Sequence, residues 1–469
     1  MSRLTPFRPT GRRSTVMSDV ATELRHLLRL AAPLALTYLA GIAINTTDIL
    51  MMGWLGPRQL AAGSLAGNYY ALFLFFGIGI AAAVSPIAAQ ALGGRRPEEM
   101  PGIVRDGFWA VLAVSLAAWV GLWHTDGFLR LIGQPDSLSL LGAQYVHAAM
   151  WGLLPALCFA VLRNVMAAHN ATVPALVISC VGIVVNALSN YALMFGKFGF
   201  PALGLVGAGL SSTVVNTLMF VALFGYMTVV PRFRRLRLFA RLWRLRLPGV
   251  RVLYALGTPI GMSNLGEMGA FVASTFLVGL FGTTQVAAHA IALQISGIVY
   301  MVSVGLGHAA TVRVGYLTGA GSRPAAALAG WCALGFGLGF SLLSALMLWL
   351  LAAPIVGLFL DPDAAGADRV LQVAVTFVGV VALFQVVDSP ATVGAGALRG
   401  FKDTRVPMAI ILFGYWALGA PLAGLMSCGL DFQGLGVWWG LAASLAIVSS
   451  LMIWRFRTMT GGERLLAPA

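Results

Sequence analysis

The chain has 469 residues, of which 59% are hydrophobic and only 10% are charged, and it carries a net charge of +14. This composition excludes a soluble globular protein and a disordered chain, because neither combines so much apolar surface with so few charges. A transmembrane β-barrel is excluded as well, since its strands would alternate apolar and polar residues in segments of about ten, whereas the apolar runs here are continuous.

Twelve apolar runs follow one another along the chain. Each is close to or above the roughly 20 residues that a helix needs to cross a hydrocarbon core. The sequence therefore predicts an all-α membrane protein with twelve transmembrane helices. The runs lie at residues 29–55, 64–92, 107–124, 138–162, 173–195, 204–230, 252–281, 285–312, 326–351, 371–396, 406–428 and 434–454.

Basic residues are divided unevenly between the two sides that twelve crossings create. If the chain starts in the cytoplasm, nearly all of the 30 Lys and Arg residues fall in cytoplasmic segments. Loops rich in Lys and Arg remain on the cytoplasmic side of a membrane. We therefore expect both termini to be cytoplasmic. The exceptions, in outer loops, are Arg58, Arg130, Lys197 and Arg369.

The second half of the chain repeats the first. A constant offset of 226 residues aligns Pro33 with Pro259 and Gln59 with Gln285, and the offset becomes 233 after an insertion at 361–369. Six crossings are an even number, so the copies form two parallel six-helix repeats around a central cavity, as in transporters whose halves rock about a shared site. We expect a basic cytoplasmic tail at 1–28, an N-lobe at 29–230, a basic cytoplasmic linker at 231–251, a C-lobe at 252–456 and a cytoplasmic tail at 457–469.

The linker sequence PRFRRLRLFARLWRLRLPGVR is rich in arginine, which would also suit nucleic-acid binding. The orientation rule explains it more simply as a cytoplasmic loop that meets anionic lipid headgroups. Membrane lipids, and no nucleic acid, are therefore the expected partners. The four cysteines have no paired spacing and predict packing residues without a disulfide; they are Cys158, Cys180, Cys332 and Cys428.

Three acidic residues lie inside apolar runs: Asp48, Glu267 and Asp388. A charge at the bilayer centre costs at least about 2.5 kcal/mol, so such residues usually face a cavity and serve transport. The alternative is protonated carboxyls that hydrogen-bond between helices. In the repeat, Glu267 corresponds to Gly41. Asp48 corresponds to Ser274. The first two acids therefore share a face of equivalent helices about 10 Å apart in depth, which predicts two different ion sites facing a common cleft.

Other polar residues inside the runs are less specific. Asn186 and Asn190 are an i, i+4 pair on one helix face, where Asp48 could meet them; interhelical hydrogen bonding is the alternative. His289 and His308 could relay protons. We interpret both histidines as structural hydrogen-bonding groups, because neither lies beside an acid in the sequence.

These residues lie in segments that resemble the multidrug and toxic compound extrusion (MATE) family, in particular its NorM-like bacterial branch. The resemblance runs from about residue 27 to 454. It is carried by Pro33 with Asp48 fifteen residues later, by Glu267, by VNALSNYALMFG and VAAHAIALQISG, and by DSPATVGAGALRGFKDTRVP, which begins at Asp388.

The resemblance implies a twelve-helix antiporter of the bacterial inner membrane, active as a monomer without a cofactor, that expels organic cations in exchange for H⁺ or Na⁺. It implies an N-lobe ion site at Asp48, Asn186, Asn190 and Ser212, the last in place of the usual threonine. It also implies a C-lobe site at Glu267 and Asp388. Phe384 replaces a tyrosine there, which removes a hydroxyl ligand of Na⁺ but leaves proton coupling or a cation–π contact. Substrate contacts are expected at Asp48, Glu267, Phe384 and Asp388.

Three other function classes are possible alternatives. One is a passive channel, although pore selectivity usually comes from rings of like groups and a two-fold repeat in a monomer does not suggest one. A flippase for a lipid-linked substrate would need a strongly basic cavity to hold pyrophosphate, and we expect no Lys or Arg inside any of the twelve helices. An intramembrane enzyme would need a nucleophile or a metal cluster, but the H-E-x-x-H and G-x-x-x-x-G-K-[ST] motifs are absent. We therefore expect a transporter and no enzyme.

Overall fold

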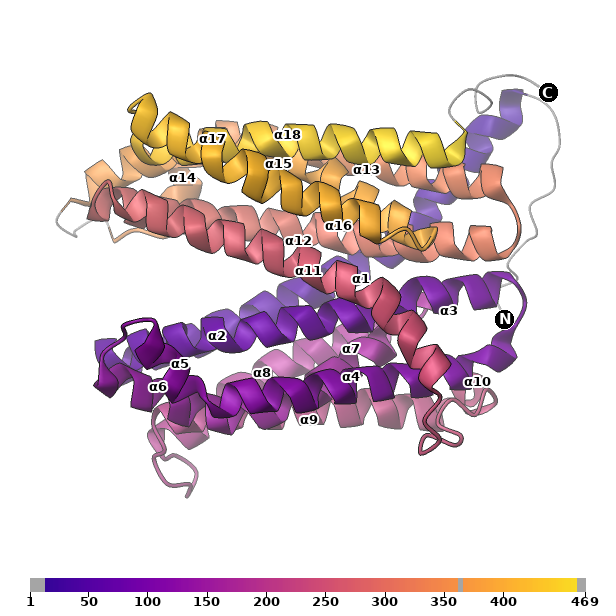
Figure 1. Ribbon diagram of the computed structural model, residues 1–469, viewed down its shortest axis with the longest axis horizontal. Coiled ribbons are helices and arrows are strands. Elements are labelled where there is room, and N and C mark those ends of the chain that lie inside the picture. The colour runs from indigo at the N-terminus through magenta and orange to yellow at the C-terminus, as the bar shows by residue number, and fades with distance from the viewer. Residues whose placement is uncertain (1–12, 362–365, 462–469) are drawn as a thin grey trace.

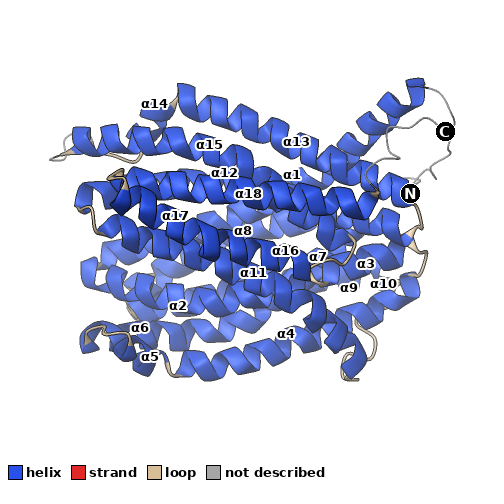
Figure 2. Ribbon diagram, turned by 45° about the horizontal axis from the view of Figure 1, so that its top comes forward, coloured by secondary structure: helices blue, strands red, loops and turns tan. Residues whose placement is uncertain are grey.

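The computed structural model describes residues 13–361 and 366–461 of the chain. Within these ranges every regular element is a helix (Figure 2). Eleven helical segments are long and apolar enough to cross a membrane. The twelfth crossing is α11, which spans 33 residues and contains Glu267. The protein is thus an all-α, multi-pass membrane protein with twelve transmembrane helices, as predicted.

The first six crossings form the N-lobe. Several are made of two helices, because a proline or a short 3₁₀ turn interrupts the α-helical hydrogen bonding. The elements are α1 (Arg13–Leu55), α2 (Pro57–Ala82) with α3 (Val84–Gly93), α4 (Met100–Trp123), the short α5 (Thr125–Leu131), α6 (Asp136–Ala149) with α7 (Leu153–Ala168), α8 (Val173–Phe195) and α9 (Leu205–Val229).

The other six crossings form the C-lobe. Its fifth crossing contains two π-helical turns, at Phe413–Gly419 and Leu425–Gly429. The elements are α11 (Leu247–Gly279), α12 (Thr283–Gly319), α13 (Arg323–Leu350), the short α14 (Ala352–Gly357), α15 (Ala367–Gly400), α16 (Arg405–Leu412) with α17 (Ala420–Gly424), and α18 (Gln433–Thr460).

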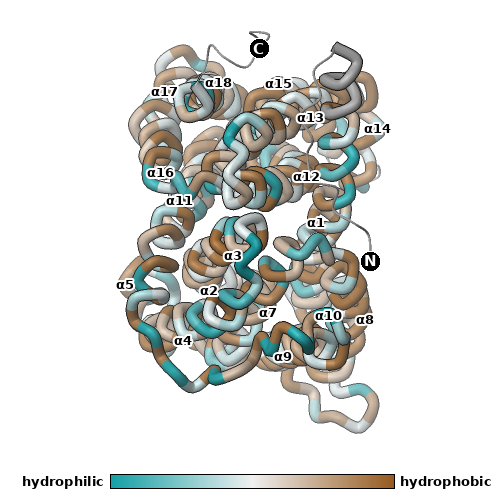
Figure 3. Tube along the Cα trace, turned by 90° about the vertical axis from the view of Figure 1, so that its right-hand side faces the viewer, coloured by the Kyte–Doolittle hydropathy of each residue, from teal (hydrophilic) through white to brown (hydrophobic). Residues whose placement is uncertain are grey.

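The two lobes lie side by side with their helices nearly parallel to one long axis (Figure 1). The start of α1 and the end of α18 lie at one end of this bundle, here called the termini end; the opposite end is the far end. Figure 3 looks at the termini end and shows hydrophilic residues mainly on loops and helix ends, such as those around α10 (Pro231–Arg234).

The first helix of each repeat crosses toward the other lobe at the termini end. The start of α1 packs beside α12 and α13, and Glu23 forms a half-buried ion pair with Arg313 of α12. The start of α11 packs beside α4 and α2, and the Tyr254 hydroxyl donates to the carbonyl of Ala110 at 2.9 Å. The first helix of each repeat therefore packs against the other repeat at the termini end.

Small residues bring the lobes into backbone contact in the termini half of the bundle. A Cβ added to Gly79 would lie 2.3 Å from Cα of Gly261. A Cβ added to Gly319 would lie 2.1 Å from the carbonyl oxygen of Gln90. By contrast, a Cβ on Gly67, nearer the far end of the same crossing as Gly79, would meet nothing within 4 Å. The lobes are thus closed against each other at the termini end.

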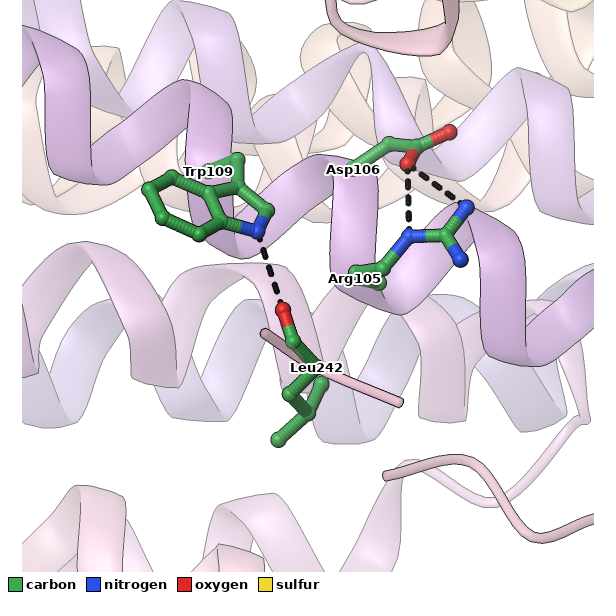
Figure 4. Close-up of polar contacts among 4 residues, drawn as sticks. All are labelled: Arg105, Asp106, Trp109 and Leu242. Carbon is green, nitrogen blue, oxygen red and sulfur yellow. Dashed lines mark hydrogen bonds and ion pairs between the residues drawn. The ribbon is translucent and has the colours of Figure 1, made fainter. Parts of the chain in front are cut away.

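The linker between the lobes is packed against the N-lobe. Trp109 of α4 donates a hydrogen bond to the carbonyl of Leu242 at 2.9 Å (Figure 4). Phe239 stacks against Phe108, with ring centroids 6.4 Å apart. Just before Trp109, Arg105 forms a buried ion pair with its neighbour Asp106 (Figure 4). The basic linker is therefore an ordered part of the N-lobe surface.

The helices extend beyond the apolar runs, which corrects one expectation. α1 begins at Arg13 and α18 ends at Thr460, so helix reaches into both segments expected to be tails. Arg163, Arg313 and Arg399 lie inside α7, α12 and α15. The expectation of helices free of Lys and Arg is therefore wrong, because arginine ends an apolar run without ending a helix.

Candidate ion and substrate sites

The N-lobe encloses a carboxyl group, Asp48 of α1, that two asparagines of α8 contact. Asn186 and Asn190 are about one turn apart, so their side chains share a helix face. Their Nδ2 atoms donate to Oδ1 of Asp48 at 2.9 and 2.6 Å. Ser212 of α9 donates to Oδ2 at 3.4 Å. The structure thus brings together the four residues that the sequence placed in the N-lobe.

This N-lobe cluster is shielded from solvent. Asp48 is 8% exposed, and Asn186 and Asn190 are fully buried. A carboxylate away from water requires such donors. Oδ1 of Asn190 has no hydrogen-bond partner among the described residues. The cluster therefore offers carboxylate, amide and hydroxyl oxygens from three helices, which suits a proton or a hard cation such as Na⁺.

A second site lies between the lobes, in a cavity of about 390 Å³. Its volume falls within the roughly 300–1,000 Å³ of small-molecule pockets. Glu267 of α11 and Asp388 of α15 both line it, together with aromatic and aliphatic side chains from α1, α2 and α12. Asp48 does not line this cavity. The prediction that the N-lobe acid shares a cleft with Glu267 is therefore wrong for this conformation.

The two C-lobe acids differ in their surroundings. Glu267 is half-buried and shares a hydrogen bond with the hydroxyl of Tyr300 of α12. Asp388 is 3% exposed, and its Oδ2 atom has no hydrogen-bond partner among the described residues. A buried carboxyl without donors is costly as a charged group. A ligand in this cavity therefore meets one acid with a hydrogen-bond donor, Glu267, and one acid whose Oδ2 has none among the described residues, Asp388.

Phe384 is one turn before Asp388 on α15 and also lines the cavity. Its ring packs edge-on against Trp438 of α18, with centroids 5.8 Å apart, and against Phe271, with centroids 6.2 Å apart. It is 1% exposed. Phe384 itself offers no hydroxyl to Asp388, whereas Tyr300 places one beside Glu267.

Sequence reasoning missed a basic group at the termini side of the cavity. Arg399 and His308 line the cavity together with Tyr38. Arg163 places its guanidinium 4.6 Å from the Tyr38 ring centroid and donates to its hydroxyl at 3.3 Å. The His308 ring lies 5.4 Å from that of Tyr38. The cavity therefore has an acidic region and a basic region.

Two six-helix lobes around a cavity that holds buried acids define a membrane transporter. The MatE family profile matches residues 33–192 and 259–425, one stretch in each lobe. The chain belongs to the MatE family, and the resemblance noted in the sequence is confirmed.

Bacterial relatives match nearly the whole chain. A probable multidrug resistance protein NorM of Brucella suis biovar 1 (strain 1330) is 39% identical over 432 residues, covering 92% of both chains. A probable multidrug resistance protein NorM of Mesorhizobium japonicum is 40% identical over 436 residues, covering 92% of this chain and 93% of the relative.

Solved structures share the fold at low sequence identity. The eukaryotic MATE transporter AtDTX14 has a TM-score of 0.84 at 19% identity and covers 96% of this chain and 100% of that one. The Vibrio cholerae MATE transporter VcmN in its bent form has a TM-score of 0.81 at 17% identity, over 96% of this chain and 99% of that one. These likenesses support the architecture of two parallel six-helix repeats.

Proposed function

We propose that this protein is a secondary active multidrug efflux antiporter, which exchanges H⁺ or Na⁺ for organic cations by alternating access. The single observation that carries the proposal is Asp388. Its buried carboxyl lines the cavity between the lobes, and the Oδ2 atom has no hydrogen-bond partner among the described residues. Such an acid gains most from binding a proton, a metal ion or an organic cation.

The exchange follows from competition for the same acids. When Asp388 and Glu267 are neutralised by protons or a coupling ion, an organic cation gains little from the cavity. When they are free, the cation gains two opposite charges and an aromatic wall at Phe384. The N-lobe cluster at Asp48 serves as a second ion site whose occupancy biases the arrangement of α1, α8 and α9.

The closed termini end supplies the alternating access. Lobe contacts at Gly79 with Gly261, and at Gly319 with Gln90, hold that end shut. Rocking of the lobes about the cavity would open this end and close the other. By the distribution of Lys and Arg the termini end is cytoplasmic, in the inner membrane of a bacterium, and the single chain functions as a monomer.

A flippase for a lipid-linked anion is the second candidate, and Arg399 together with His308 in the cavity supports it. Glu267 and Asp388 oppose it, because each would repel a pyrophosphate group in the same space. The bacterial relatives are named multidrug resistance proteins, which also favours an organic cation as substrate.

The experiment is ethidium efflux from proteoliposomes under an imposed pH gradient, and then under an imposed Na⁺ gradient. Antiport requires that one gradient drives ethidium uphill and that ethidium moves H⁺ or Na⁺ in return. Accumulation at the same rate with neither gradient would contradict antiport. Movement of a fluorescent lipid-linked pyrophosphate, without movement of ethidium, would favour the flippase.

A further inference from the structure

Three packed helices of the C-lobe hold a group of buried polar atoms without partners. Of the twelve buried side-chain atoms that lack a hydrogen-bond partner among the described residues, six lie on α12, α15 and α18. Folded proteins leave few such atoms, and a cluster of them usually marks bound water. The six belong to Gln285, His289, Ser303, Gln385, Asp388 and Trp438.

These residues lie along the packed helices α12, α15 and α18 and are here called the polar seam. His289, Ser296 and Ser303 repeat every seven residues along α12, which keeps them on one face of the helix. Gln385 of α15 crosses the seam and donates to the Ser296 hydroxyl at 2.9 Å and to its carbonyl at 3.0 Å. Asp388 lies about one turn after Gln385, so its side chain is on a similar face of α15.

The seam connects the cavity with the far end of the bundle. Ser296 and Asp388 line the cavity. Beyond them His289 is fully buried, with Nε2 3.3 Å from the Thr275 hydroxyl, and its Nδ1 atom has no partner among the described residues. One turn farther, Gln285 donates to Oε1 of Gln433 at 3.1 Å. Gln433 is exposed at the start of α18.

The fold itself does not require this polarity. At the repeat offset of 226, His289 corresponds to Gly63 and Ser303 corresponds to Gly77 in the N-lobe. At the later offset of 233, Gln385 corresponds to Gly152. At these three positions the N-lobe has glycine, whereas Gln285 corresponds to Gln59 and Ser296 corresponds to Tyr70. The side chains of His289, Ser303 and Gln385 therefore indicate a task beyond helix packing.

We infer that the seam binds a chain of water molecules, with His289 as its central proton carrier, which conducts protons between the far-end surface at Gln285 and Asp388. This inference rests on the proposed proton coupling and deepens it. A cation in the cavity covers the direct approach to Asp388, whereas the seam reaches the same carboxyl through the lobe. The seam thus lets Asp388 gain or lose its proton while the substrate is bound.

Charged and titratable groups near this route come from several helices. Glu267 of α11 and Tyr300 of α12 line the cavity with Asp388, as do Arg399, eleven residues farther along α15, and Tyr415. His289 is farther along and packs against Trp438, with ring centroids 5.4 Å apart. A proton that reaches His289 therefore meets, within the described part of the chain, no acid other than those at the cavity.

The test compares His289→Leu, which removes both ring nitrogens, with His289→Gln, which keeps a donor and an acceptor. Ser341→Ala in α13 is the control, because its hydroxyl bonds only within its own helix. Proteoliposomes loaded with tetraphenylphosphonium report pH-driven exchange, and equilibrium binding of tetraphenylphosphonium reports the cavity. We expect His289→Leu to slow exchange by about 10²-fold, which is the low end for loss of a positioned proton-transfer group. Binding of tetraphenylphosphonium should not change. His289→Gln should recover most of the exchange rate.

A second readout does not depend on transport. X-ray radiolytic labelling oxidises side chains next to bound water, and we expect labelling at His289 and Trp438 although both are fully buried. The inference would be overturned if His289→Leu exchanged at the wild-type rate, or if both His289 variants lost binding and exchange equally. The absence of labelling at His289 and Trp438 would also overturn it. If the wild type shows no pH-driven exchange but the seam is labelled, the proposed coupling fails while the water chain stands.

Discussion

Asn190 of α8 donates a hydrogen bond of 2.6 Å to Oδ1 of Asp48 of α1, and this bond joins two helices deep inside the N-lobe. Asn186, about one turn earlier, donates to the same oxygen. A charged acceptor away from water gains more from each donor than a neutral one does. Asn186 and Asn190 therefore stabilise the N-lobe and also affect which ion Asp48 can bind.

Replacing Asn190 with Ala should lower the free energy of unfolding by about 1.5–3 kcal/mol, the range for a hydrogen bond to a charged group. It should also abolish efflux, because Asp48 would then favour its neutral form at all times. Thermal unfolding in detergent and ethidium efflux from cells measure the two effects. Tyr191→Phe, next in the chain but exposed, should change neither. Full efflux by the Asn190→Ala variant would mean that Asp48 does not take part in coupling ion exchange to efflux.

Asp388→Asn and Glu267→Gln should each abolish drug resistance in a transporter-deficient host without reducing the amount of protein in the membrane. Asp388 lacks a hydrogen-bond partner among the described residues, so removal of its charge should leave the unfolding free energy equal or higher. Asp368→Asn, exposed at the start of the same helix, is the matched control. Resistance that persists in both cavity variants would end the antiporter proposal.

Tyr300→Phe tests whether the phenol supports Glu267. Loss of one hydrogen bond is worth about 1 kcal/mol, which corresponds to a roughly fivefold change in an equilibrium constant. We expect the ethidium concentration for half-maximal efflux to change by about that factor, with the maximal rate retained. Tyr316→Phe on the same helix, outside the cavity lining, should match the wild type. If Tyr300→Phe also behaves like the wild type, the Tyr300 phenol serves packing alone.

Much of this architecture was predictable from the sequence, because a transmembrane helix must be apolar over about 20 residues whatever its neighbours are. The N-lobe cluster was predictable for a similar reason, since the i, i+4 spacing of Asn186 and Asn190 determines a common face. Tyr300 was not predictable. A tyrosine within an apolar helix is an ordinary packing residue, and only the packing of α12 against α11 brings its hydroxyl to Glu267.

Helix ends and basic residues were the least predictable features. Arg399 follows the end of an apolar run and has the appearance of a loop residue, yet α15 continues to Gly400 and Arg399 lines the cavity. Arginine supports a helix almost as well as leucine does, so a fall in hydropathy marks the membrane boundary rather than the helix end. The same reason explains why α1 begins as early as Arg13.

Arg399→Gln separates the two candidate functions. For a cation exporter, removal of a positive charge from the cavity should leave ethidium binding as tight or tighter, because Arg399 competes with the substrate for Glu267. For a carrier of lipid-linked pyrophosphate, the same change should abolish transport. Equilibrium binding of ethidium to purified protein is the measurement. Loss of ethidium binding in a variant that remains folded would contradict the role assigned to the two acids.

Gly79→Ala should shift the protein toward a state that is open at the termini end. The added Cβ would lie 2.3 Å from the backbone of Gly261, and neither backbone can move aside while the lobes remain closed. Gly67→Ala on the same helix is the control, because its Cβ would meet nothing within 4 Å. Spin labels on exposed residues of the two lobes at the termini end report the distance between the lobes by electron paramagnetic resonance. We expect the Gly79 variant to populate longer distances and the Gly67 variant to keep the wild-type distribution; identical distributions in both would mean that this contact does not hold the end closed.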